Sequence, residues 1–284
     1  MIALYSYRSS NIGDDFQSYV MRNYLRRDDI VFLERNKAHE YNGPEIDLLA
    51  HGFMCVESFP IAKKIRPHFL ATWLGPMVLD KAPHNVEYLK KHETIGCRDT
   101  DTYDRATALG LDAYFCGCPS ILCDPHPSEV EEPGTITFVD VNPRLFTRRC
   151  GDFSRKTLED KLIEHMEIAP ITWYSQVVCT DLSEEERWAL CEYRHRMLTR
   201  SEMIVTSKIH VAPPALGMGK AVVFVKDEIS VPGRLTAFPP SFKTYEPEQC
   251  PRIVLRPEEH RYDVSAYRAH VAECTDRAVQ KIVG

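Results

Sequence analysis

The stretch TSKIHVAPPALGMGKAVVFV, residues 206–225, contains in order a strand end, a polar loop, a short helix and an apolar strand. Pro213 and Pro214 suit the first helical positions, where a missing backbone N–H costs little. Gly217 and Gly219 are expected to end that helix before the next strand begins. The stretch therefore predicts one strand–helix–strand unit of a parallel sheet.

The same alternation of strand and helix patterns continues in both directions from this unit. Strands are expected at 2–7, 29–34, 46–53, 135–141 and 171–180, with short ones around HFLATWLG and ETIGCRD. Helices are expected at 15–26, 101–110, 183–200 and 263–283, with another from near Ser154. Asp14 is expected to cap the first helix, and Ser183 with Glu186 forms a capping box for the helix at 183–200. The alternation predicts an α/β protein with mostly parallel sheets.

A segment rich in proline and acidic residues, CDPHPSEVEEPG at 123–134, separates two runs of this alternation. It has no apolar periodicity, which is typical of a linker. We therefore expect an N-terminal domain at 1–125, a C-terminal domain at 135–258 and a final helical segment at 259–284. Ligands bind beyond the carboxyl ends of parallel strands, so the cleft between the domains is the expected site.

Composition and charge exclude several classes of protein. The 284 residues include 35 basic and 41 acidic side chains, and the net charge of −6 gives no general attraction to nucleic acid. We find neither an apolar run long enough to span a membrane nor a signal-peptide core, so we expect a cytoplasmic protein. The ten cysteines are interpreted as reduced and mainly buried. CGCPSILC, at 116–123, suits zinc poorly, and we expect neither a metal nor a cofactor.

The loop at 207–210, which opens the expected short helix, is a candidate anion site. The free N–H groups of a helix start favour a negative charge, and Lys208 adds a positive one. His210 can donate a hydrogen bond or move a proton near neutral pH. From the residues alone, the loop is either an anion site or an ordinary turn with a surface lysine and a capping histidine.

Three further residues are interpreted from their positions. His51 lies at a predicted strand end that would face the cleft, which makes it a candidate for substrate binding. Trp73 and Trp173 are interpreted as core residues rather than as platforms for a sugar ring.

Three motifs occur in a characteristic order: NIGDD at 11–15, IGCRDTDTYDRATALGLDAYFCGCPSIL at 95–122, and VTSKIHVAPPALGMGKAVVFV at 205–225. Together they resemble the polysaccharide pyruvyl transferase family. The resemblance implies a fold like that of GT-B glycosyltransferases: two Rossmann-like domains face a cleft, with the acceptor on the N-terminal side and the donor on the C-terminal side. It also implies a C-terminal helix that crosses back. Members of the family transfer pyruvate from phosphoenolpyruvate to two hydroxyls of a sugar, forming a cyclic ketal.

The resemblance also implies roles for residues on the donor side. Phosphoenolpyruvate carries a carboxylate and a phosphate close together, so more than one fixed cation is expected to hold it. Arg98 and Lys208 are expected to converge on this small anionic donor from separate domains, with Ser207 beside Lys208. His210 is expected to protonate the enol carbon.

On the acceptor side, the resemblance implies roles for the NIGDD motif. Asp14 or Asp15 is expected to accept the proton of the attacking sugar hydroxyl. Asn11 and Gly13 are expected to contribute to substrate binding.

The sequence departs from the family pattern at two positions. Lysine stands at 208 where the family has arginine, and lysine lacks the planar fork that grips a carboxylate or phosphate through two bonds. The usual Gly-x-Pro turn is Gly219-Lys220-Ala221 here. These departures leave two alternatives open: a glycosyltransferase that uses a nucleotide sugar, and a non-catalytic glycan-binding homologue.

Overall fold

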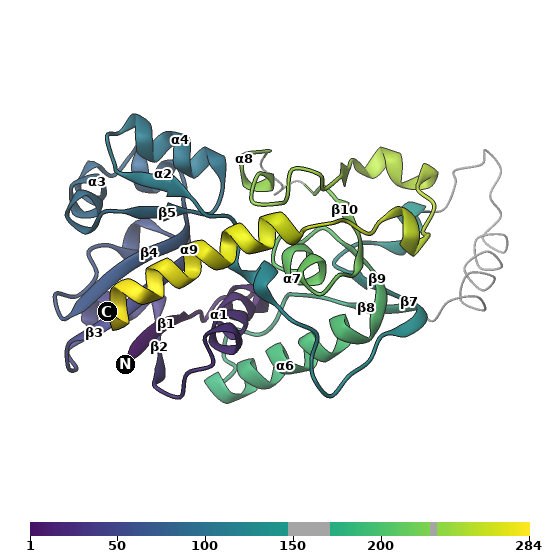
Figure 1. Cartoon of the computed structure of the whole chain (residues 1–284), viewed down its shortest axis with the longest axis horizontal. Helices are drawn as coiled ribbons and strands as arrows, with labels where there is room; N and C mark the ends of the chain where they lie inside the picture. Colours follow the sequence, from purple (N-terminus) through teal and green to yellow (C-terminus); the bar gives the residue numbers. More distant parts are fainter. Residues whose placement is uncertain (147–170, 228–231) are drawn as a thin grey trace.

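The computed structural model describes residues 1–146, 171–227 and 232–284, which form two parallel sheets with helices packed around them (Figure 1). The expected α/β class, with two mostly parallel sheets of GT-B-like type, is confirmed. The helix expected from near Ser154 lies outside the described residues.

The first sheet has six parallel strands in the order β2-β1-β3-β4-β5-β6. Its strands are β1 (Ile2–Ser6), β2 (Ile30–Glu34), β3 (Ile46–Met54), β4 (Ile65–Leu74), β5 (Ile95–Cys97) and β6 (Ala113–Phe115). Its helices are α1 (Ile12–Leu25), α2 (Pro76–Leu79), α3 (Pro83–Leu89) and α4 (Thr100–Ala108), with 3-10 helices η1 (Arg35–Glu40), η2 (Val56–Ser58) and η3 (Lys90–His92). Strands covered on both faces read as continuous apolar runs, and β1 is of this kind because Ile2 and Leu4 are as fully buried as Ala3 and Tyr5.

The second sheet has five parallel strands in the order β11-β10-β9-β7-β8. Its strands are β7 (Glu132–Val139), β8 (Ile171–Tyr174), β9 (Ser201–Thr206), β10 (Ala221–Val225) and β11 (Thr244–Tyr245). Its helices are α6 (Glu184–Arg200), α7 (Ala212–Gly217) and α8 (Pro232–Leu235), with 3-10 helices η5 (Pro143–Phe146), η6 (Pro247–Arg252) and η7 (Pro257–Glu259). The capping box of Ser183 and Glu186 begins α6 as predicted, and two prolines occupy the first turn of α7.

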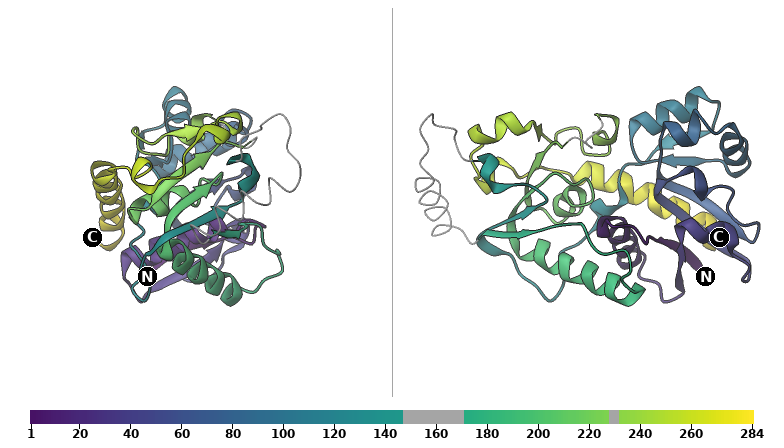
Figure 2. Two further views of the ribbon diagram at one scale, coloured as in Figure 1. Left: turned by 90° about the vertical axis from the view of Figure 1, so that its right-hand side faces the viewer. Right: turned by 180° about the vertical axis from the view of Figure 1, so that it is seen from behind.

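The last helix, α9 (Ser265–Val283), runs from the second sheet back to the first, as the resemblance implies (Figure 1). Val271 on its first half belongs to an apolar cluster shared with α7 and β10. Cys274 and Ala278 on its second half pack against the apolar residues of β1. Seen from behind, α1 lies next to α6, which runs along the second sheet (Figure 2). Both α9 and α1 therefore join the two halves of the molecule.

The start of α1 differs from the prediction. The helix begins at Ile12 and its N-cap is Asn11, whose side-chain oxygen accepts a hydrogen bond from the backbone N–H of Gly13 at 3.0 Å. Asp14 instead accepts a hydrogen bond from Ser9 Oγ at 2.7 Å. The prediction that Asp14 caps the helix is therefore wrong. Several residues of this loop have capping side chains, and contacts with distant residues decide between them.

One strand end agrees with its predicted position and another differs from it. β3 ends at Met54, one residue beyond the predicted end, and passes through Gly52 at a positive φ of 76° and a shift of register against β4. β8 stops at Tyr174 instead of continuing to residue 180. It stops because the following backbone pairs elsewhere: Ile12 N–H donates to Gln176 O at 3.0 Å, and Val178 N–H donates to Ser10 O at 2.8 Å.

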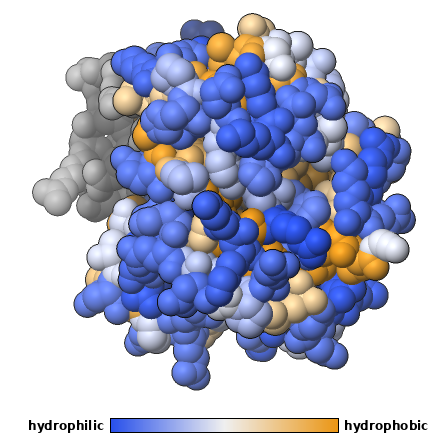
Figure 3. Space-filling view, turned by 90° about the vertical axis from the view of Figure 1, so that its left-hand side faces the viewer, coloured by the Kyte–Doolittle hydropathy of each residue, from blue (hydrophilic) through white to orange (hydrophobic). Residues whose placement is uncertain are grey.

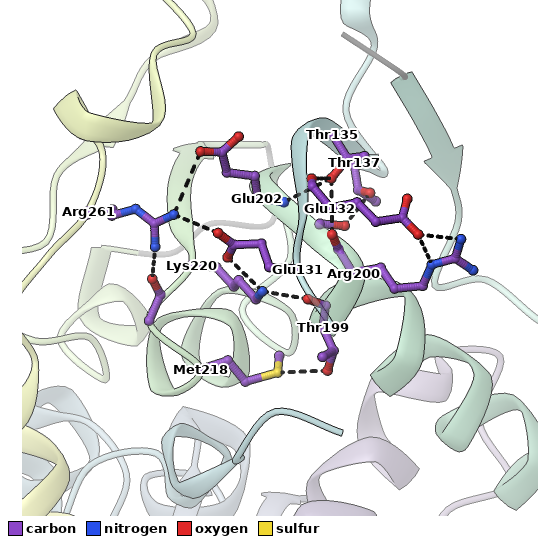
Figure 4. Close-up of polar contacts among 12 residues, drawn as sticks. Glu131, Glu132, Thr135, Thr137, Thr199, Arg200, Glu202, Met218, Lys220 and Arg261 are labelled. Atoms are coloured by element: carbon purple, nitrogen blue, oxygen red, sulfur yellow. Dashed lines mark hydrogen bonds and ion pairs between the residues drawn. The ribbon is translucent and has the colours of Figure 1, made fainter. Parts of the chain in front are cut away.

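The segment between the two sheets is held against the second sheet by side-chain contacts. After η4 (Pro119–Leu122), an irregular chain leads to β7, which starts at Glu132. Lys220, only 4% exposed, bonds through Nζ with Glu131 Oε2 at 2.9 Å and with the carbonyl of Thr199 at 2.5 Å (Figure 4). Arg261 contacts the other oxygen of Glu131 at 3.1 Å. The lysine that follows Gly219 in the altered Gly-x-Pro turn thus has a structural contact of its own.

The surface of the N-terminal end is mostly hydrophilic, with separate apolar patches between the charged side chains (Figure 3). Within the described ranges, no helix combines the length and apolar character needed to cross a bilayer. The cysteines that the structure describes are free and mostly buried, as expected, although Cys179 is exposed.

Candidate active site

In each sheet the strand order reverses at one strand, and the carboxyl ends of the strands of the two sheets meet at these points. In the first sheet, β1 lies between β2 and β3; in the second, β7 lies between β8 and β9. A crevice forms where successive connections leave a sheet in opposite directions, and this is where ligands bind in such folds. Residues 10–12, which follow β1, pair with residues 176–178, which follow β8. The two crevices are therefore adjacent.

A cavity of about 220 Å³ lies at this junction. Its walls are formed by Ser10, Asn11, Asp140, Gln176, Val177, Ser207, Lys208, Ile209, His210, Asp227 and Arg234. A larger hollow of about 750 Å³ lies at the opposite end of α1, lined by residues such as Arg26 and His195. We take the smaller cavity as the candidate site because the loops at the carboxyl strand ends converge on it.

Asn11 and His210 meet across the junction of the two halves. Asn11 Nδ2 lies 3.1 Å from His210 Nδ1. The asparagine oxygen already accepts a hydrogen bond from Gly13 N–H, so the amide nitrogen must be the donor to the ring. Nδ1 is then the acceptor, and the proton of the neutral ring is on Nε2. Gly13 allows this approach, because a Cβ at that position would lie 2.5 Å from Cβ of His210.

His210 is a buried, neutral imidazole. It is 5% exposed, and burial lowers its pKa to about 4, an effect that Asp14 opposes and that Arg98, Arg234 and Lys208 reinforce. Nε2 has no hydrogen-bond partner among the described residues, and Asp14 Oδ1 lies 3.7 Å away. A neutral ring with an unused N–H is suited to donate a hydrogen bond to a bound molecule.

Arg98 is buried next to this histidine. It follows β5 and is 1% exposed, and its Nη1 donates to Gln17 Oε1 at 3.3 Å. Nε and Nη2 find no acceptor in the part of the chain that the structure describes. Asp99 caps α4 through Oδ1, which accepts from the N–H of Thr102, and its Oδ2 has no hydrogen-bond partner in the described residues. Arg98 does not itself line the cavity, but its charge acts on His210.

The loop after β9 carries the other predicted donor-side residues. Lys208 lines the cavity, and its Nζ forms an ion pair with Asp227 at 2.9 Å. Ser207 Oγ donates to the carbonyl of Asp140 at 3.2 Å. Lys208 and His210 line the same cavity, and Arg98, which follows a strand of the other sheet, lowers the pKa of His210 by its charge.

Asp15 and His51 lie apart from the cavity. Asp15 accepts hydrogen bonds from Tyr7 N–H at 2.7 Å and from Arg187 Nε at 2.8 Å, and it joins α1 to α6. Burial raises the pKa of Asp15 to about 6, although its bonds with Tyr7 and Arg187 lower it. His51 is fully buried, with Nδ1 2.9 Å from Leu49 O and Nε2 2.9 Å from Ser18 Oγ. The expectation that His51 faces the cleft is wrong, because its ring is buried and bonded to Ser18 of α1.

Trp73 and Trp173 differ in their surroundings. Trp73 is partly buried and stacks on Phe53 with ring centroids 5.0 Å apart. Trp173 is 56% exposed, so its interpretation as a core residue is wrong.

Among the lining residues that sequence reasoning missed, three are charged: Asp140, Asp227 and Arg234. Arg234 follows Pro232 and Gly233 in a segment without a motif or periodicity, so no sequence signal singles it out. Burial lowers the pKa of Arg234 to about 10, and the charge of Arg98 acts in the same direction. Three cations of the site are therefore close enough to influence the same imidazole. Within the described ranges, no group of three metal-ligating side chains is placed to hold a metal ion.

Comparison with known proteins gives a family match and several similar solved structures. A family model described as polysaccharide pyruvyl transferase matches residues 11–226. Similar solved structures include a functionally uncharacterised protein from Klebsiella pneumoniae subsp. pneumoniae NTUH-K2044, with 14% identity and a TM-score of 0.46, over 83% of this chain and 86% of that chain. A variant of the wall teichoic acid polymerase TagF has 14% identity and a TM-score of 0.44, over 98% of this chain and 84% of that chain. No curated protein sequence matches this chain.

Proposed function

The chain belongs to the polysaccharide pyruvyl transferase family, and from this premise we propose that it transfers pyruvate from phosphoenolpyruvate to a sugar of a surface or capsular polysaccharide precursor. The observation that carries this proposal is the buried His210, which offers an unused Nε2–H beside the unpaired guanidinium atoms of Arg98.

The proposed reaction joins one donor to two hydroxyls of one sugar. The methylene carbon of phosphoenolpyruvate gains a proton and becomes a methyl group. Both hydroxyl oxygens form bonds to the central carbon, and the bond from that carbon to the phosphate oxygen breaks. One hydroxyl proton replaces the proton given to the methylene carbon, and the other leaves with the phosphate. The products are a cyclic ketal and inorganic phosphate, and no oxidant or reductant is needed.

His210 is suited to the first proton transfer. Its Nε2 carries the proton, and the ring is neutral at pH 7 because burial lowers its pKa. A bound dianion would raise the pKa of this ring, and the imidazolium formed with the donor in place could then give its Nε2 proton to the methylene carbon. Asp14, 3.7 Å from Nε2, is placed to accept the proton of the attacking hydroxyl. Asp15 is not placed for this role, because Arg187 and Tyr7 hold it.

The test incubates the protein with phosphoenolpyruvate and a panel of oligosaccharides that carry free diols. We expect phosphate release that depends on the oligosaccharide, and a product heavier by one pyruvate less one water. Release of phosphate without any change in the sugar would contradict the proposal.

Binding measurements separate the alternatives. Stabilisation by a ligand at 100 times its dissociation constant is about 2.7 kcal/mol, which a thermal-shift assay detects. Phosphoenolpyruvate is expected to give such a shift, and His210→Ala is expected to abolish transfer. A response to nucleotide sugars alone would indicate a glycosyltransferase. A protein that binds glycan and loses nothing on His210→Ala would be a non-catalytic homologue.

A further inference from the structure

Arg234 is an arginine from one half of the molecule that is held by the other half. It belongs to α8, which follows the second sheet's β10, yet its guanidinium carbon lies 5.1 Å from the ring centre of Trp73 at the end of β4. Trp73 stacks on Phe53 of β3 at an interplanar angle of 16°, and Arg35 lies 5.4 Å from the other ring of this pair. A guanidinium within about 6 Å of an indole is attracted by its π-system.

The segment around Arg234 is also fixed to the first half by polar and close contacts. The hydroxyl of Thr236 accepts a hydrogen bond from Thr100 N–H at 2.8 Å, at the start of α4. A Cβ at Gly233 would lie 2.5 Å from Cβ of Asp101, so the backbone of α8 approaches α4 as closely as a glycine allows. The hydroxyl of Tyr267 donates to Ala237 O at 2.6 Å. The position of Arg234 is therefore determined from both sides.

Among the cations of the site, both guanidinium groups have nitrogens without a hydrogen-bond partner in the described residues, whereas the lysine forms an ion pair. Nε of Arg234, like Nε and Nη2 of Arg98, is buried with no hydrogen-bond acceptor in the described residues. Lys208 is paired with Asp227 at 2.9 Å. The carboxylates whose charges reach Arg234 are those of Asp99, Asp14 and Asp227, and each has a hydrogen-bond or ion-pair partner elsewhere.

Arg98 and Arg234 lie on adjoining segments, because Thr100, two residues after Arg98, donates its N–H to the hydroxyl of Thr236, two residues after Arg234. The charge of Arg98 also lowers the pKa of Arg234. A buried and a partly buried guanidinium group that repel each other favour an anion with more than one negative charge. We infer that Arg234 is a donor-binding residue that forms, with Arg98, a two-guanidinium site for a carboxylate–phosphate dianion, and that Trp73 acts as its positioning residue. This inference rests on the proposed function, whose donor is such a dianion. Lys208 lacks the planar guanidinium fork of the family's arginine, and Arg234 of α8 would supply such a fork from a different segment of the chain.

The test measures dissociation constants for phosphoenolpyruvate and for inorganic phosphate by titration calorimetry. Arg234→Ala is expected to weaken phosphoenolpyruvate binding by about 10- to 100-fold, because it removes a charge-assisted contact. Arg234→Lys is expected to recover only part of this loss, since it keeps the charge without the fork. Arg256→Ala is the matched control: its side chain is 65% exposed, and the change in net charge is the same. It is expected to leave the affinity unchanged.

The positioning role of Trp73 has its own readout. Trp73→Ala is expected to weaken donor binding by about 3- to 10-fold, whereas Trp73→Phe keeps an aromatic face and most of the affinity. In the Arg234→Ala background, Trp73→Ala is expected to add nothing, because the arginine through which it acts is absent. An equal effect of Trp73→Ala in both backgrounds would overturn this role.

The outcomes distinguish the inference from the function on which it rests. If phosphoenolpyruvate binds and Arg234→Ala binds it as tightly as the unaltered protein, the inference is wrong and the function stands. If phosphoenolpyruvate does not bind but phosphate does, and Arg234→Ala weakens that binding, the donor is wrong and the two-guanidinium site stands. If neither anion binds, both are wrong. Circular dichroism of each variant confirms that it is folded.

Discussion

Asn11 Nδ2 and His210 Nδ1 lie 3.1 Å apart, although 199 positions separate these residues in the chain. Because the asparagine oxygen is held by Gly13 N–H, this contact places the ring proton on Nε2, the nitrogen next to Asp14. The side chain of Asn11 thus caps α1 through its oxygen and fixes the tautomer of His210 through its nitrogen.

This relationship predicts a graded loss of turnover. His210→Ala removes the proposed acid and is expected to lower kcat by about 10²- to 10⁴-fold while donor affinity changes little. Asn11→Ala leaves the ring but no longer fixes its tautomer, so a smaller loss in kcat is expected. Steady-state kinetics with varied phosphoenolpyruvate checks both. A variant of His210 that retains full turnover would rule out its role as the acid.

The two neighbouring aspartates are expected to behave differently. Asp14→Asn is expected to lower kcat, because the proposed base is lost, with little change in the free energy of unfolding. Asp15→Ala is expected to lower the free energy of unfolding by about 3–5 kcal/mol, since it leaves the buried Arg187 without its partner. Urea denaturation and kinetics on the same preparations separate the two effects. The assignment fails if Asp15→Ala is stable and inactive.

Lys220 offers a prediction about stability alone. Lys220→Ala is expected to cost about 1–3 kcal/mol, because the buried carbonyl of Thr199 and the partly buried Glu131 both lose a donor. Lys226→Ala is the control. Its ion pair with Glu246 lies at the surface, where such pairs contribute less than about 1 kcal/mol. Equal midpoints of denaturation for the two variants would contradict the structural role of Lys220.

The buried His51 makes stability depend on pH. Burial lowers its pKa to about 4, so between pH 6.5 and 4 the unfolded chain takes up a proton that the folded chain does not. Stability contributed by the neutral ring is therefore lost as the pH falls, by roughly 2 kcal/mol at pH 5. His51→Gln is expected to lose less stability than the unaltered protein between pH 7 and 5, as measured by urea denaturation.

The pH experiment needs a control, because other buried groups titrate in the same range. Asp15 has a raised pKa of about 6, so it takes up a proton in the folded state first and adds stability as the pH falls. Comparing variants removes this contribution. His39→Gln, at an exposed histidine, is expected to follow the unaltered protein. If His51→Gln follows it too, the buried ring does not cause the loss.

The sequence predicts features that depend on neighbours in the chain. The capping box of Ser183 and Glu186 and the proline-rich start of α7 need only residues within one or two helical turns, and the structure has both. The alternation of patterns predicts parallel sheets for a similar reason. The cap of α1 is harder to predict: Asn11 and Asp14 are both good caps, and a contact with a residue on the other side of the molecule decides between them.

The site was predictable only where a motif marks it. The motifs lead to Arg98, Lys208 and His210, which the fold brings together. His51 was placed wrongly because its ring is buried against Ser18 of α1, a contact between distant residues that the strand pattern does not reveal. Arg234 was missed because its importance comes from Trp73 and Arg98, which lie far away in the chain, and pairs of this kind leave no local pattern in a single sequence.

The path of α9 bears on the order in which the chain can fold during synthesis. Cys274 and Ala278 pack in one apolar cluster with Ile2 and Leu4, so β1 is covered by a helix that is made long after it. A ribosome that has released the first sheet but not α9 has released an incomplete core, with one apolar side of β1 still exposed to water. Completion of the core around β1 must therefore wait until α9 has left the ribosome.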